Sequence, residues 1–162
     1  MVSGRVMRWR KLAWRAILWI VRRRFQEVPR VSTAELASWL ADPARLAPTL
    51  LDAREAEEFA VSHLAGAVWA DPRSSGREAS EKCPPGRAVV VYCSAGYRSA
   101  ILARRLIGAG TPAVYNLEGS IFAWANEGRP LEANGVPVKT AHPYNRAGAI
   151  LLSPGLAARV GR

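Results

Sequence analysis

The segment that most constrains the fold is the uncharged run from Ala88 to Tyr92, together with the loop and the periodic stretch that follow it. Small, β-branched and aromatic residues in such a run are typical of a strand buried on both faces of a parallel sheet. From Ser99 to Ile107, apolar side chains recur four residues apart, which predicts an amphipathic helix. A buried strand followed by a loop and a helix predicts an α/β fold.

The loop between this strand and helix begins with a cysteine and ends with an arginine. A thiol at the carboxyl end of a buried strand, facing a helix N-terminus, meets unpaired backbone N–H groups and the positive end of the helix dipole. Both favour the thiolate, which is the nucleophilic form of cysteine. A lone cysteine beside a strand is usually a small buried hydrophobe, but small residues and an arginine follow this one. We therefore predict that Cys93 is a catalytic nucleophile.

The rest of the loop is suited to surround an anion. Ser94, Ala95 and Gly96 have little side chain to obstruct backbone amides that point inward. Arg98 adds a positive charge, which could bind the anionic end of a substrate or close the loop by bonding its carbonyl groups, and Tyr97 could shape the mouth of the pocket. The predicted substrate-binding residues are Ser94, Ala95, Gly96, Tyr97 and Arg98.

Several motifs, in a fixed order along the chain, resemble those of the rhodanese (sulfurtransferase) family. Besides the cysteine loop they are Leu50–Arg54 (LLDAR), the pair Glu58-Phe59 with His63–Ala67 (HLAGA), and Val114–Trp124. The resemblance covers about residues 31–138 and implies a parallel five-stranded sheet with helices on both faces. Serines at positions 62 and 120 stand where the family commonly has glycine, which affects local turns rather than the cysteine loop.

Charge and turn residues divide the chain of 162 residues into three parts. Residues 1–30 carry nine basic residues against Glu27 alone, so most of the net charge of +10 lies at the N-terminal end. We expect a basic amphipathic helix in residues 1–28, a rhodanese-like domain in 29–138 and a C-terminal extension in 139–162. Within the extension, the apolar stretch 147–152 is expected to dock on the domain or to meet the N-terminal helix.

The N-terminal helix interleaves basic residues with tryptophans, which suits an anionic membrane surface. Its longest uncharged run, Ala16–Val21, is far shorter than the ~20 apolar residues that span a bilayer. Packing on the domain or on a protein partner is the alternative, and nucleic acid is less favoured because no recognition motif accompanies the charge. Two cysteines are too few for a disulfide framework, which fits a reducing compartment. Together with the basic helix, this predicts a cytoplasmic protein, peripheral at the inner face of the membrane.

The remaining elements follow from capping and turn residues. Ser32 and Glu35 have capping-box spacing and predict a helix that ends near Leu40. Residues 71–86 are mostly polar, with glycine and proline, and predict a loop with one helical turn. Three more strands are expected at 50–52, 66–70 and 113–116, and two more helices at 55–59 and 121–126, the latter capped by Ser120.

Three residues outside the loop are predicted to support the site. Asp52 and Arg54 follow a neighbouring strand, where sites of α/β proteins gather. We expect Asp52 to lie near the loop, whereas Arg54 is better explained as a structural ion pair with Glu58, four residues on. His63 is expected to satisfy backbone groups. Cys83 could resolve a product on Cys93, but a free surface thiol is favoured.

The resemblance implies a sulfurtransferase. The Cys93 thiolate would take a sulfane sulfur from a donor such as thiosulfate and pass it, as a persulfide, to a thiol, cyanide or a carrier protein, with no cofactor and no metal. The alternatives are a partner-binding module without turnover, or a phosphatase or arsenate reductase on the same scaffold. Cell-cycle dual-specificity phosphatases share that scaffold but have five residues between cysteine and arginine, whereas Cys93 and Arg98 are separated by four.

Overall fold

The chain is described by a computed structural model, which covers the backbone of residues 2–160 and the side chains of residues 8–160. The basic Arg5 side chain and the last two residues of the predicted extension lie outside that range. The helices are α1 (Val2–Arg24), α2 (Thr33–Ala41), α3 (Ala56–Val61), α4 (Gly76–Ser80), α5 (Tyr97–Gly108), α6 (Ser120–Asn126) and the 3-10 turn η1 (Gly148–Leu151). The strands are β1 (Arg30–Val31), β2 (Thr49–Asp52), β3 (Val68–Trp69), β4 (Val89–Tyr92), β5 (Val114–Leu117), β6 (Leu131–Ala133) and β7 (Val136–Val138).

The centre of the fold is a five-stranded sheet in the order β1-β5-β4-β2-β3, in which every neighbouring pair is parallel. Strand β4 lies in the middle and all four of its residues are buried, as its uncharged sequence predicts. Asp52 of β2 is in register with Tyr92 of β4, so these two strands end side by side. Residues that follow β2 and β4 therefore meet at one edge of the sheet.

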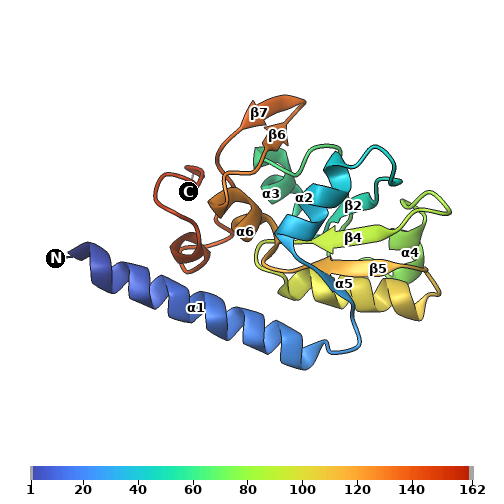
Figure 1. The fold of residues 1–162 in the computed structure, drawn as a ribbon, viewed down its shortest axis with the longest axis horizontal. Helices are drawn as coiled ribbons and strands as arrows, with labels where there is room; N and C mark the ends of the chain where they lie inside the picture. Colours follow the sequence, from blue (N-terminus) through green and yellow to red (C-terminus); the bar gives the residue numbers. More distant parts are fainter. Residues whose placement is uncertain (1, 161–162) are drawn as a thin grey trace.

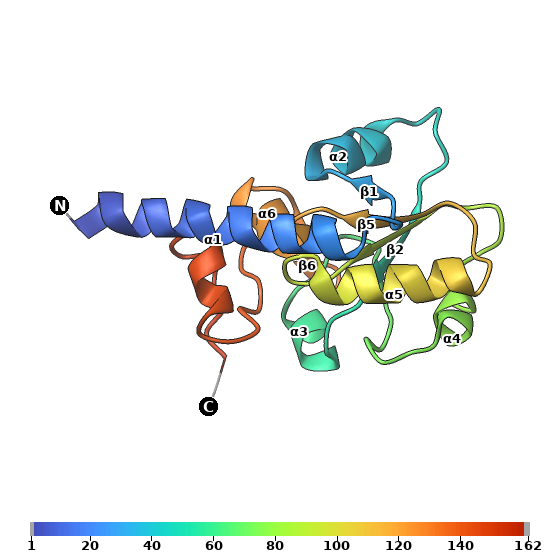
Figure 2. The ribbon, with the colours of Figure 1, turned by 90° about the horizontal axis from the view of Figure 1, so that it is seen from below.

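Side chains of β4 alternate between two hydrophobic cores. Val89 and Val91 pack with Leu102 and Leu106 of α5 on one side of the sheet. Val90 and Tyr92 pack on the other side, with residues of α2 and α6 that include Leu36, Trp39, Ile121 and Phe122. Figure 2 shows α2 on one side of the sheet and α4 and α5 on the other. The predicted fold, a five-stranded parallel sheet with helices on both faces, is confirmed.

Three local features differ from the sequence prediction or were missing from it. Strand β1 is only two residues long, and it pairs with β5 through bonds such as that from Asn116 N to Pro29 O. Strands β6 and β7 form a hairpin around Asn134 and Gly135, both with positive φ. Such an Asn-Gly turn is a strong hairpin signal, and this hairpin was not predicted. The prediction that Ser120 caps α6 was wrong, because Gly119 occupies the N-cap position.

Helix α1 packs against the domain through its C-terminal half, whereas its N-terminal half extends beyond the domain (Figures 1 and 2). Val21 of α1 and Phe25, directly after the helix, are buried in the core beside α5. The indole of Trp14 donates a hydrogen bond to the carbonyl of Leu151 in η1 (3.1 Å), and Leu151 is itself part of the other core. The predicted segment 147–152 thus contacts both the domain and α1.

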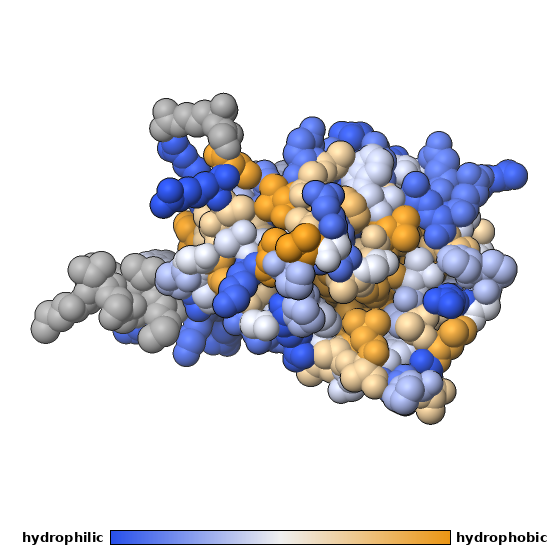
Figure 3. Space-filling model, turned by 90° about the horizontal axis from the view of Figure 1, so that it is seen from above, coloured by the Kyte–Doolittle hydropathy of each residue, from blue (hydrophilic) through white to orange (hydrophobic). Residues whose placement is uncertain are grey.

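Within residues 2–160, none of the helices is both long enough and apolar enough to cross a bilayer. On the face shown in Figure 3, hydrophobic side chains lie scattered among hydrophilic ones, an arrangement that is ordinary for a protein surface.

Candidate active site

Cys93 lies at the carboxyl end of β4, three residues are between it and the start of α5, and only 2% of it is exposed. The backbone N–H of Gly96 donates a hydrogen bond to its sulfur at 3.2 Å. Gly96 has φ +114°, a conformation that favours glycine and lets the loop turn this amide inward. Because the first N–H groups of α5 also lack intrahelical acceptors, the loop and helix stabilise negative charge on the sulfur.

Ser99 is the second neighbour of the sulfur. Its hydroxyl oxygen lies 3.4 Å from Cys93 Sγ and 2.6 Å from Asn116 Oδ1, and the Asn116 amide in turn donates to Gly96 O at 3.0 Å. A hydroxyl has one proton, so Ser99 donates either to the asparagine or to the sulfur. When it donates to Asn116, its oxygen can accept a hydrogen bond from the Cys93 thiol. When it donates to Cys93, it can stabilise an anionic sulfur. Neither Ser99 nor Asn116 was predicted as a site residue, although Asn116 is a polar residue between apolar ones in β5.

Arg98 is held in a bidentate ion pair with Glu58 of α3. Its two terminal nitrogens lie 2.7 and 2.9 Å from the carboxylate oxygens, and one of them also donates to Ser94 Oγ at 2.8 Å. The hydroxyl of Ser94 donates to the same carboxylate at 3.1 Å. Arg98 thus closes the loop through the Ser94 side chain and Glu58, and not through the loop carbonyls that the sequence analysis considered.

The Glu58–Arg98 pair remains charged at neutral pH. Burial alone would raise the pKa of Glu58, but hydrogen bonds from Arg98 and from the backbone of Glu55, with the positive charges nearby, lower it below its ordinary value. Burial alone would lower the pKa of Arg98, but hydrogen bonds to Glu58 and the negative charges of Cys93 and Glu58 raise it. The loop therefore ends in an ion pair that is charged at neutral pH.

The expected pairing of Arg54 with Glu58 was wrong. Arg54 and Asp52 are both fully buried, and Arg54 Nε lies 2.9 Å from an oxygen of Asp52. Arg54 Nη2 also donates to the carbonyl of Ser62 at 2.6 Å. The i, i+4 spacing predicted the wrong partner because the Glu58 carboxylate bonds Arg98 instead. The Arg54 guanidinium bonds the Asp52 carboxylate, two residues before it. Asp52 and Arg54 form a structural pair beside the site.

His63 also has a supporting place. Its Nδ1 lies 3.0 Å from the carbonyl oxygen of Phe59, and its ring stacks on the Phe59 ring at a centroid distance of 4.0 Å. Its backbone forms an antiparallel bridge with Glu132 near the β6–β7 hairpin. These contacts anchor α3, which carries Glu58, against the C-terminal part of the domain.

Two tyrosines border the loop from outside. Tyr97, the first residue of α5, is exposed and meets the ring of Phe25 edge-on at 5.2 Å. The ring of Tyr144, from the C-terminal extension, lies over the guanidinium of Arg98 at 4.5 Å. Tyr144 was not predicted as a site residue, since nothing in the extension marks which residue returns to the loop. Cys83 lies three residues after the end of α4; it is a free thiol, half-buried rather than on the surface as expected, and burial raises its pKa.

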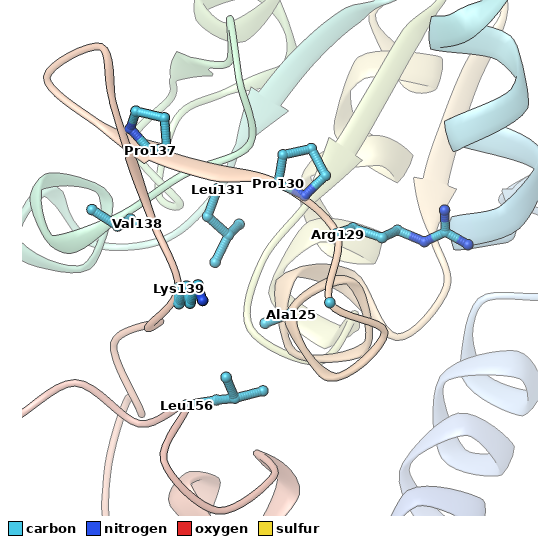
Figure 4. Close-up of a pocket in the computed structure, with 9 residues that line it drawn as sticks. Ala125, Arg129, Pro130, Leu131, Pro137, Val138, Lys139 and Leu156 are labelled. Atoms are coloured by element: carbon cyan, nitrogen blue, oxygen red, sulfur yellow. The ribbon is translucent and has the colours of Figure 1, made fainter.

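An apolar pocket of about 430 Å³ lies apart from this loop (Figure 4). It is formed where the end of α6, the β6–β7 hairpin and the C-terminal extension meet. Its lining contains none of the loop residues 93–98, so it is not the opening to the sulfur. The lining residues are Ala125, Gly128, Arg129, Pro130, Leu131, Pro137, Val138, Lys139 and Leu156.

Comparison with known proteins identifies the family. The sequence pattern described as "Rhodanese-like domain" matches residues 32–127, more than half of the chain. The chain belongs to the rhodanese-like family. A protein named "Sulfurtransferase" from Allochromatium vinosum is 33% identical over 106 residues, which cover 65% of this chain and 96% of that protein. The "Probable adenylyltransferase/sulfurtransferase MoeZ" of Mycobacterium tuberculosis is 34% identical over 102 residues, 62% of this chain but only 25% of that relative's length.

Solved structures agree with the rhodanese-like fold. A rhodanese-related protein from Thermoplasma volcanium, 25% identical, superposes with a TM-score of 0.55 over 64% of this chain and 97% of the other. Thiosulfate sulfurtransferase from Pseudomonas aeruginosa superposes with a TM-score of 0.63 over 84% of this chain and 26% of that one, at 24% identity. These structures support the rhodanese-like fold of this chain.

Ser120 gives this rhodanese-like domain a testable local feature. It has φ +50°, in the left-handed region, and its hydroxyl accepts a hydrogen bond from Cys93 N at 3.1 Å. Ser120→Ala is expected to lower the free energy of unfolding by about 1–3 kcal/mol, because a buried N–H loses its acceptor. Ser120→Gly loses the same bond but relieves the backbone, and is expected to be about 1 kcal/mol more stable than the alanine variant. Urea denaturation compares the alanine and glycine variants. Equal stability would contradict the expectation that the positive φ at position 120 strains a residue other than glycine.

Proposed function

We propose that this protein transfers a sulfane sulfur through a persulfide on Cys93, with thiosulfate as a usable donor. The observation that carries the proposal is the sulfur of Cys93 at the N-terminus of α5, with the Gly96 N–H at 3.2 Å and the Ser99 hydroxyl at 3.4 Å. These groups stabilise an anionic sulfur, which both the attacking thiolate and the persulfide require. Membership of the family and the two relatives named as sulfurtransferases support the same reaction type.

Two nucleophilic displacements make up the proposed cycle. The Cys93 thiolate attacks the outer sulfur of thiosulfate, the S–S bond of thiosulfate breaks, and sulfite leaves with the bonding electron pair. An acceptor nucleophile, such as a thiolate or cyanide, then attacks the outer sulfur of the persulfide and releases the Cys93 thiolate. Each step exchanges one S–S bond for another bond to sulfur, so the cycle needs no external oxidant. The covalent intermediate predicts ping-pong kinetics.

The contacts of Arg98 bear on how an anionic donor would be bound. Both of its terminal nitrogens already bond Glu58, so Arg98 holds the loop in place. The negative charge of Glu58 partly balances its positive charge, which leaves less to attract an anionic donor. We propose that the loop amides bind the donor and that Arg98 keeps the loop closed around it. Of the two roles considered from sequence, loop closure is the one that these contacts support.

The alternative of phosphate chemistry is less well supported. The loop from Cys93 to Arg98 is one residue shorter than that of the phosphatases on this scaffold, so its amides surround a smaller space, closer to a single sulfur atom. A phosphatase also needs a general acid for the leaving group. The carboxylate next to the loop, Glu58, has a lowered pKa and is committed to Arg98, so it is not a proton donor at neutral pH.

Intact-protein mass spectrometry after incubation with thiosulfate tests the proposal. The wild-type protein is expected to gain one sulfur atom, which cyanide removes, and Cys93→Ser is expected to gain none. Cys83→Ser is the matched control and should behave as wild type, because Cys83 lies away from the loop. Sulfur on Cys83 alone would overturn the assignment. Cys93-dependent hydrolysis of aryl phosphates without sulfur uptake would favour the phosphatase alternative.

A further inference from the structure

The outward face of α1 has no part in the proposed reaction. The domain buries one side of this helix, through Trp14, Ile17 and Val21. The opposite side carries two tryptophans, Trp9 and Trp19, which are 66% and 64% exposed, together with the exposed Leu12 and Ile20. At 3.6 residues per turn these four side chains fall within about a third of the helix circumference. The helix thus has a second apolar face that the described part of the protein leaves uncovered.

Basic residues flank this apolar face. Arg8, Lys11 and Arg15 are exposed and lie along one border of the four apolar side chains. Arg23 falls within the apolar sector, at the end of the helix nearest the domain, where a long side chain can reach outward. The sequence Val2–Arg24 contains eight basic residues and no acidic one. The rest of the chain has 15 basic residues (23 minus 8) against 13 acidic ones, so the positive charge is concentrated in α1.

We propose that the outward face of α1 binds an anionic lipid bilayer, with the helix axis in the plane of the membrane. Trp9 and Trp19 have an apolar body and one N–H donor, which suits the level of the lipid headgroups. Leu12 and Ile20 enter the acyl boundary, and the flanking basic residues meet anionic headgroups. The N-terminal half of α1 extends beyond the domain, so the domain does not prevent the helix from lying flat (Figures 1 and 2).

The observations favour a bilayer over two other occupants. A second copy of α1 would bring two strongly positive helices together, which like-charge repulsion opposes. A nucleic acid would satisfy the basic residues and could stack on tryptophan, but it offers no apolar layer for Leu12 and Ile20. An anionic bilayer satisfies all three features of the face at once, namely the aliphatic side chains, the tryptophans and the charge.

Docking through α1 would bring the cysteine loop close to the membrane surface. Trp14 lies against Gly119, next to Ser120, which binds the backbone of Cys93. Phe25 contacts Tyr97 at the start of α5, and Arg22 bonds Glu118 at 2.7 Å. These contacts fix the orientation of α1 relative to the loop. Lipid binding itself does not depend on Cys93, so Cys93→Ser is expected to bind vesicles as wild type does, whether or not the proposed sulfur transfer is correct.

Vesicle co-sedimentation of the full-length protein tests the proposal. Wild type is expected to bind equimolar phosphatidylglycerol–phosphatidylcholine vesicles and to bind pure phosphatidylcholine far more weakly, with affinity that falls as salt is raised. The variant Arg8→Gln/Lys11→Gln/Arg15→Gln is expected to bind about 100-fold more weakly, since each basic residue near an anionic surface contributes roughly a factor of five. Substitutions are preferable to truncation because Val21 and Phe25 belong to the core.

A matched triple variant and a second readout complete the experiment. Arg77→Gln/Lys82→Gln/Arg87→Gln removes the same charge from exposed positions on the domain and should bind nearly as wild type. Trp9→Ala/Trp19→Ala should weaken binding about tenfold without changing the thermal unfolding midpoint. Equal loss in both triple variants would show charge attraction without a defined face and overturn the proposal. So would absence of wild-type binding, or self-association or single-stranded DNA binding through α1 in place of lipid binding.

Discussion

Glu58→Ala is expected to lower the free energy of unfolding by about 3–5 kcal/mol and to abolish measurable sulfur transfer. Glu58 is almost fully buried and holds both Arg98 and Ser94, so its loss leaves a partly buried guanidinium and a buried hydroxyl without their acceptor. The loop that surrounds Cys93 would then lose the clamp at its far end. Urea denaturation measures the first effect, and persulfide formation by mass spectrometry measures the second. Glu57→Ala, at the exposed neighbouring position, is the control and should change neither.

The same residue predicts a pH dependence with a definite sign. The pKa of Glu58 is lower in the folded protein than its ordinary value. The ion pair therefore contributes its full stability above the unfolded pKa of about 4.3, and this contribution is lost as the pH falls through the folded pKa. Glu58→Gln should lose less stability on acidification than wild type does. Other carboxylates with lowered pKa, such as Glu118, are present in both proteins, so the difference isolates Glu58. Parallel pH profiles would contradict the assignment.

Arg54→Met is expected to destabilise the fold by about 3–5 kcal/mol, because it leaves the fully buried Asp52 carboxylate without its partner. The double variant Asp52→Leu/Arg54→Met removes both charges and should recover at least half of that loss, since an apolar pair needs no compensation for burial. Arg54 Nη1 and Ser62 Oγ have no hydrogen-bond partner in the described part of the chain, so the native pair itself carries a cost. Urea denaturation of the two single variants and the double variant measures this recovery. If the two single losses of stability add up in the double variant, the predicted recovery is contradicted.

The activity of the Asp52→Leu/Arg54→Met variant shows whether the buried pair takes part in the reaction, as the loop does, or only supports the fold. Arg54 and Asp52 lie beside the site and bond each other rather than the sulfur. The double variant, where folded, is therefore expected to form the Cys93 persulfide with thiosulfate. Failure of a stably folded double variant to form it would place the pair in the reaction itself.

The sequence predicted the parts of the fold that depend on local patterns. The uncharged run of β4, the capping box at Ser32 and the apolar repeat of α5 each correspond to an observed element within about two residues. Elements that depend on tertiary partners were harder. Strand β1 is two residues long, too short for any periodicity, and exists because β5 offers an open edge.

In the candidate site, too, the residues that are contiguous in sequence could be predicted, and those from distant elements could not. Cys93 and its loop could be found from sequence because strand, small residues and helix are contiguous. The residues that hold the loop come from other elements: Glu58 from α3, Asn116 from β5 and Tyr144 from the extension. A helical spacing rule assigned Glu58 to Arg54, whereas a bidentate partner forty positions later takes it. Sequence spacing does not show such partners, because the tertiary arrangement of separate elements brings them together.

The hydrogen bond from Trp14 to Leu151 has a consequence for synthesis. Its two residues are 137 positions apart, so one partner is made long after the other. At about 5–20 residues per second, a ribosome needs roughly 7–30 s to add the missing segment. Until residues 97–108 are made, α1 has neither η1 nor α5 to cover its inner side, and both of its apolar faces are available. A lipid surface could therefore engage the nascent helix before the domain exists, and the finished protein would be assembled already in place.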